Sequence, residues 1–156
     1  MVFDATHGPQ QTIAFGTGGT PNLNLDGSGS LYVGGTSGAA GGLGTLAVRN
    51  GGVLELGGTL KLWSTGTVIL DGGTIRTQTF DRSAGTFTWT SGTVQFSQNL
   101  SIAPAEPFGQ AITVGAAQAL TVTQTLSVPS GGSLLVNGGT VTAGLGFGIF
   151  ALRRRR

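Results

Sequence analysis

The feature that most constrains the fold of this chain is a recurring unit of four or five strand-forming residues followed by a glycine corner. Residues 45–56 (TLAVRNGGVLEL) align with residues 125–136 (TLSVPSGGSLLV), 80 positions later. A shorter echo links residues 71–75 (DGGTI) to residues 137–141 (NGGTV). Recurrence of one unit is typical of chains in which each coil stacks on the last and like residues lie above like.

Two all-β folds are compatible with these units. Asn-Gly and Asp-Gly between strands can form hairpin turns, which would give an antiparallel β-sandwich or barrel. In a parallel β-solenoid the same glycines form corners at which the chain bends without reversing. Stacked coils place equivalent residues over one another, so a solenoid favours a repeated sequence unit. The repeats therefore predict a solenoid, a right-handed β-helix of about five or six coils. Strands that start every six to eight residues in the clearest stretch predict coils of about 20 to 26 residues.

The alternation of side chains along each strand predicts which residues fill the interior. The residues predicted to point inward are Leu54, Leu56, Leu60, Leu62, Val68, Leu70 and Ile75. The same parity places the charged residues Glu55, Lys61 and Arg76 outside, where solvent should be. The aromatic residues of the middle third are interpreted as core or stacking residues, with a sugar-binding platform as the alternative; they are Trp63, Phe80, Phe87, Trp89 and Phe96.

The pattern of units divides the chain into three parts. Residues 1–20 are predicted to be a loosely ordered N-terminal segment, and residues 21–143 the solenoid. Residues 103–110 contain two prolines, which cannot donate to a strand ladder, and are predicted to project as a loop. Residues 144–156 form an apolar, glycine-rich tail that ends in four arginines.

Charge and composition argue against several classes of protein. The formal charge of +2 includes the four terminal arginines; the rest of the chain has four basic and six acidic residues, so no basic face for nucleic acid is expected. The longest apolar run before the tail is about four residues, whereas a spanning helix needs about 20, so no stable membrane span is expected. The sequence contains no cysteine, which excludes disulfides and thiolate metal sites.

The sequence offers little for catalysis. His7 is the single histidine, so neither a histidine-based triad nor a multi-histidine metal site can form. Asp71, Asp81, Arg76 and Arg82 are the candidates for a carbohydrate-active β-helix enzyme, which would need gathered carboxylates and a basic group. Asp71, however, precedes two glycines and is typical of a turn. We therefore predict that the chain is not an enzyme, with no catalytic, metal or cofactor site.

Several of these units are similar to those of a known group of proteins. Residues 50–54, 58–63, 70–76 and 137–141 resemble repeats of exported bacterial surface proteins, namely PEP-CTERM sorting-domain proteins of planctomycete type and the passenger-associated strand repeats of autotransporters. The resemblance covers roughly residues 22–143. The end of the tail, Arg153, Arg154, Arg155 and Arg156, resembles a sorting signal, although the Val-Pro-Glu-Pro motif is missing before it.

The resemblance implies a parallel β-solenoid, export, and a structural or adhesive role at the cell surface or outside the cell. The implied partners are polysaccharides or components of the envelope or matrix, and the ends of the solenoid are expected to favour self-association. A carbohydrate-active enzyme or a carbohydrate-binding passenger is the alternative. The first residues lack the features of a secretion signal, so we expect the chain to be a fragment of a longer exported protein.

Overall fold

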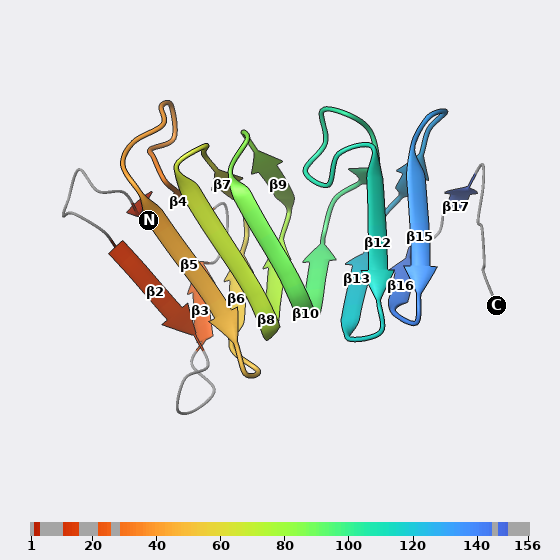
Figure 1. Cartoon of the computed structure of the whole chain (residues 1–156), viewed down its shortest axis with the longest axis horizontal. Coiled ribbons are helices and arrows are strands. Elements are labelled where there is room, and N and C mark those ends of the chain that lie inside the picture. Colours follow the sequence, from red (N-terminus) through yellow and green to blue (C-terminus); the bar gives the residue numbers. More distant parts are fainter. Residues whose placement is uncertain (1, 4–10, 16–21, 26–28, 145–146, 150–156) are drawn as a thin grey trace.

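The chain folds as a parallel β-solenoid (Figure 1). The computed structural model describes residues 2–3, 11–15, 22–25, 29–144 and 147–149, and every strand pair among them is parallel. The predicted solenoid is thus confirmed, and the antiparallel sandwich or barrel is excluded. None of these residues forms a helix that is long and apolar enough to cross a membrane.

Each coil contributes strands to three faces. The first face contains β2 (Gln11–Phe15), β5 (Gly44–Arg49), the first halves of β8 (Gly66–Thr77) and β10 (Thr86–Phe96), β12 (Ala111–Gly115) and β15 (Ser133–Asn137). The second face contains β3 (Asn22–Leu25), β6 (Val53–Leu56), the second halves of β8 and β10, β13 (Gln118–Val122) and β16 (Thr140–Ala143). The third face contains β1 (Val2–Phe3), β4 (Leu31–Val33), β7 (Thr59–Leu62), β9 (Thr79–Arg82), β11 (Leu100–Ser101), β14 (Leu126–Val128) and β17 (Phe147–Ile149).

The length of a coil varies with its corners and loops. Thr74 pairs with Thr93 across a short stretch of chain, whereas the stretch from Gln11 to its partner Gly44 is much longer. The second face carries a strand from each of six successive coils, joined by five pairings. The solenoid therefore has about five turns, within the predicted number of coils.

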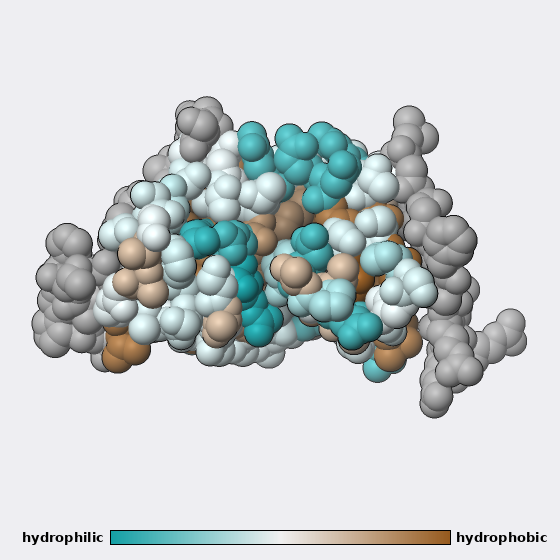
Figure 2. Space-filling view, turned by 90° about the horizontal axis from the view of Figure 1, so that it is seen from above, coloured by the Kyte–Doolittle hydropathy of each residue, from teal (hydrophilic) through white to brown (hydrophobic). Residues whose placement is uncertain are grey.

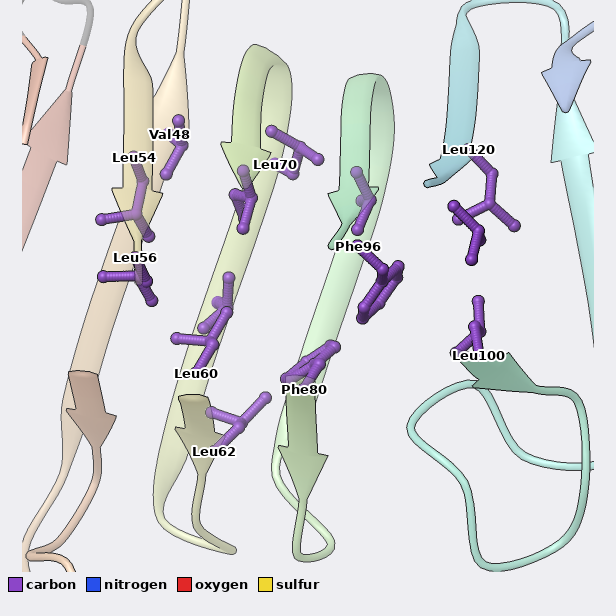
Figure 3. Close-up of a cluster of buried hydrophobic side chains, with 14 of the residues drawn as sticks. Val48, Leu54, Leu56, Leu60, Leu62, Leu70, Phe80, Phe96, Leu100 and Leu120 are labelled. Atoms are coloured by element: carbon purple, nitrogen blue, oxygen red, sulfur yellow. The ribbon is translucent and has the colours of Figure 1, made fainter. Parts of the chain in front are cut away.

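Alternating side chains fill the interior as the parity predicted. All seven residues assigned to the inside are at most 4% exposed. Figure 3 shows Leu54 and Leu56 of β6 and Leu60 and Leu62 of β7 in one buried cluster. On the outside, Arg76 Nη1 lies 3.5 Å from Glu55 Oε2. Each buried aliphatic side chain contributes about 1.5–3 kcal/mol to the free energy of folding, so this column is the main source of stability.

Glycines form the corner between the first and second faces. Gly51 N donates to Gly72 O at 2.7 Å, so that successive corners are bonded to one another. Gly92 has a φ of 96°, in a region that L side chains rarely adopt, and its backbone lies against the carbonyl of Gly73. The glycine pairs of the sequence therefore mark bends of a continuing coil.

The strands extend beyond the range predicted for the solenoid. β1 and β2 lie within residues 1–20, where they pair with β4 and β5. At the other end, β17 lies within residues 144–156 and pairs with β14. Parallel pairing therefore continues through the described strands on both sides of the predicted solenoid range.

Candidate functional site

Asp71 and Asp81, the two acidic candidates for catalysis, lie on different parts of the surface. Asp71 is at the corner between the first and second faces, where its Oδ1 accepts a hydrogen bond from Ser91 Oγ at 3.0 Å. Asp81 is on the third face, where it forms an ion pair with Lys61 and accepts a hydrogen bond from Ser83 Oγ at 3.2 Å. Each carboxylate therefore bonds to a side chain of a neighbouring coil, Ser91 for Asp71 and Lys61 for Asp81.

The two basic candidates are also separated. Arg76 lies on the second face between Glu55 and Gln95, and its Nε donates to Gln95 Oε1 at 3.3 Å. Arg82 follows Asp81 in β9, but its guanidinium bonds to backbone carbonyls. The structure does not gather the four candidates into one site. Among the described residues, no group of three or more His, Asp or Glu could hold a metal ion. His7 and Arg153 to Arg156 lie outside the described residues.

The strand pairing of the solenoid is interrupted between its fourth and fifth coils. On the second face the ladder is continuous, because Gly92–Phe96 pairs with Gln118–Val122. On the first face, β10 and β12 belong to different sheets, and on the third face so do β9 and β11. We call the break in pairing between the first half of β10 and β12 the wedge; Figure 1 shows these two strands standing apart.

An insertion coincides with the wedge. The stretch of chain from Gly92 to its partner Gln118 is longer than the stretch from Thr74 to its partner Thr93. The additional length includes residues 103–110, which we call the wedge loop. It forms turns, with Glu106 N donating to Ala103 O at 3.0 Å and Gly109 N to Glu106 O at 2.8 Å. Within it, Pro107 is buried and Phe108 is half-buried, so part of the loop packs against the solenoid.

Five aromatic rings meet at the wedge and form what we call the aromatic cluster: Phe80, Phe87, Trp89, Phe96 and Phe108. Phe108 is at its centre, with ring centroids 6.0–6.3 Å from those of the other four. Phe80 and Phe96 are buried, whereas Phe87, Trp89 and Phe108 are only partly covered. In the middle of Figure 2, hydrophobic residues (brown) lie between hydrophilic ones (teal).

Two polar side chains make hydrogen bonds beside the wedge. Arg82 Nε donates to Gly85 O at 2.9 Å and Arg82 Nη1 donates to Pro107 O at 3.4 Å, which ties the wedge loop to β9. Gln118 Nε2 donates to Trp89 O, and Gln118 Oε1 accepts from Gly115 N at 2.7 Å. A cavity of about 230 Å³ opens beside the start of β10, lined by Arg82, Ala84 and five residues of the wedge loop between Pro104 and Gly109.

We expect Arg82→Ala to loosen the wedge loop. The substitution removes the hydrogen bonds to Gly85 O and Pro107 O, so the backbone amides of residues 105–110 should exchange with solvent roughly five- to tenfold faster. Hydrogen–deuterium exchange checks this. Arg76→Ala is the matched control, because Arg76 bonds on the second face. Unchanged exchange in the loop of the Arg82 variant would show that its guanidinium does not hold the loop.

The sequence alone indicates some of the residues at the wedge but not the wedge itself. The aromatic residues were predicted to be in the core, and four of the five lie in the aromatic cluster; Trp63 instead donates from Nε1 to Thr36 O at 2.7 Å. The available signal was Phe108 within a proline-flanked insertion. Comparisons with protein-family models, curated proteins and solved structures find no match for this chain.

Proposed function

We propose that this chain is a non-catalytic structural or adhesive module of an exported bacterial protein, located at the cell surface or outside the cell. The observation that supports the proposal is the regular arrangement of hydroxyl groups on the outside of the solenoid. On the first face, Thr45 pairs with Thr67 and Thr67 with Thr86. On the third face, the hydroxyls of Thr59 and Thr79 lie 2.8 Å apart.

Such rows suit contact with a repeating polymer. Paired strands lie about 4.8 Å apart, so stacked threonines present hydroxyl groups at a constant interval. Each exposed hydroxyl contributes little to binding alone, but many weak contacts along one rigid rod add through multivalency. Polysaccharides and other components of the envelope or matrix are therefore the proposed partners.

We expect beads coated with the protein to adhere to immobilised matrix components, to polysaccharide or to bacterial cells more strongly than beads coated with albumin. Multivalent display should raise retention under flow by at least about tenfold. A second coat should carry Thr86→Glu and Thr88→Glu, which place charges on the exposed outside of the first face; if the row of hydroxyls makes the contact, this coat should be retained less than the native one. Equal retention of the native and albumin coats on all three surfaces would contradict adhesion.

A further inference from the structure

The first half of β10 has an unpaired edge inside the solenoid. Thr86–Trp89 pairs with Thr67–Leu70 of β8 on one side, and no described strand pairs with it on the other. β12 pairs with β15 alone, so its edge at the wedge is unpaired too. Because the break lies between complete coils, it does not depend on what precedes or follows this chain.

The direction of the backbone groups shows what this edge offers. Gln118 belongs to the next coil and donates to Trp89 O, so the carbonyl of Trp89 points into the wedge. In a strand the N–H and C=O of one residue point to the same side, as do those of the residues two positions away, so the N–H and C=O of Phe87 also point into the wedge. A regular row of N–H and C=O groups is what an added β-strand recognises.

The side chains add a second requirement for a partner. Phe87 and Trp89 point inward and are partly covered, and Phe108 lies against both, with centroids 6.0 and 6.1 Å away. On the outside, Thr86 and Thr88 are exposed. A strand in the wedge would place every second side chain on the aromatic rings and the others beside hydroxyl groups.

We propose that the wedge binds an extended segment of another polypeptide by β-strand addition. The segment alternates apolar side chains, which cover Phe87, Trp89 and Phe108, with hydroxyl-bearing ones, which continue the row of threonines. Arg82 and Glu106 contribute one charge of each sign to the lining of the cavity beside the start of β10, so an uncharged segment fits. A polysaccharide would cover the rings but lacks the row of amide donors and acceptors. The proposal goes beyond adhesion by the outer faces and does not require it.

The probe is a fluorescein-labelled peptide that copies residues 64–70 (STGTVIL), an uncharged stretch, because its Thr67–Leu70 part already pairs with the opposite edge of β10. We expect saturable binding to the purified protein by fluorescence anisotropy. Two further peptides carry N-methyl groups on the amides of Val68 and Leu70, or of Thr67 and Ile69. Only one of these two pairs of amides faces β10, so at least one of the two peptides should bind more weakly. Each blocked amide that faces β10 should weaken binding roughly fivefold, because a ladder hydrogen bond is lost while the side chains remain.

The two tryptophans locate the bound peptide. In a Trp63→Phe protein the emission comes from Trp89 and should shift to the blue as the peptide covers it, whereas in a Trp89→Phe protein the emission of Trp63 should stay unchanged. Circular dichroism of both variants checks that they fold. No saturable binding, insensitivity to both N-methylated peptides, or a response of Trp63 alone would overturn the proposal. The proposal would also be overturned if a soluble polysaccharide shifted the emission of Trp89 and the peptide did not. Bead adhesion is measured separately, so either proposal can fail alone.

Discussion

Phe96→Ala should lower the free energy of unfolding by about 3–5 kcal/mol, as expected for truncation of a buried phenylalanine. Phe96 is 1% exposed and meets Phe108 edge to face, with ring centroids 6.0 Å apart. It also pairs with Val122 on the second face, where the strand ladder is continuous across the break. Figure 3 shows Phe96 between Phe80 on one side and Leu100 of β11 and Leu120 of β13 on the other. Its loss would leave a cavity at the junction between the two halves of the solenoid.

Urea unfolding followed by circular dichroism measures this loss. The matched control is Gln95→Ala, in the same strand but pointing outward, where it accepts a 3.3 Å hydrogen bond from exposed Arg76. We expect the control to change the free energy of unfolding by less than about 1 kcal/mol, since exposed polar contacts contribute little. Similar losses in the two variants would mean that the aromatic cluster does not hold the two halves together.

The fold was predictable because two local rules agree along most of the chain. Alternation placed Leu54 and Leu60 inside, and glycine pairs placed the corners between strands. Charged residues gave an independent check, since Glu55 and Arg76 occupy the outward positions of paired strands. Side-chain parity and corner chemistry are local properties, so they can be read without knowing which strands become neighbours.

The repeats identify the strand-and-corner unit but not the coil. Residues 45–48 lie on the first face, whereas their counterparts at 125–128 lead into β14 on the third face. By contrast, Thr74 and Thr140 both lie on the second face, three coils apart. One unit can therefore serve any face, and the coil length follows from the loops. This explains why the spacing of strands predicted coils of similar length, while the pairing of Gln11 with Gly44 encloses a longer one.

The wedge was not predictable because it depends on contacts between distant residues. Arg82 occupies the position that pairs with buried Leu62, yet no described strand stacks on β9 on its far side, so its side chain turns to the wedge loop. Phe108 joins Phe80 although the two are far apart in the sequence. Two prolines indicated a break in the ladder, but they could not show that the loop packs back onto the rings.

Gly92→Ala should destabilise the protein by about 3–5 kcal/mol or prevent it from folding, because two costs act together. The residue has a φ of 96°, which disfavours any L side chain. In addition, an added Cβ would overlap the carbonyl oxygen of Gly73 and lie 2.9 Å from its nitrogen. Both neighbours are backbone atoms of the preceding coil, so they can move only if the corner and its ladder move too.

Two other glycines separate these costs. Gly109 has a φ of 70° but nothing within 4 Å of an added Cβ, so Gly109→Ala should cost only the backbone strain, about 1–2 kcal/mol. Gly38 has open space and no positive φ, and Gly38→Ala should change stability by less than about 1 kcal/mol, in the stabilising direction if at all. Urea unfolding of the three variants should therefore rank Gly92 above Gly109 and Gly109 above Gly38. If Gly92→Ala cost no more than Gly109→Ala, close stacking of successive corners would not limit the side chains that the solenoid accepts there.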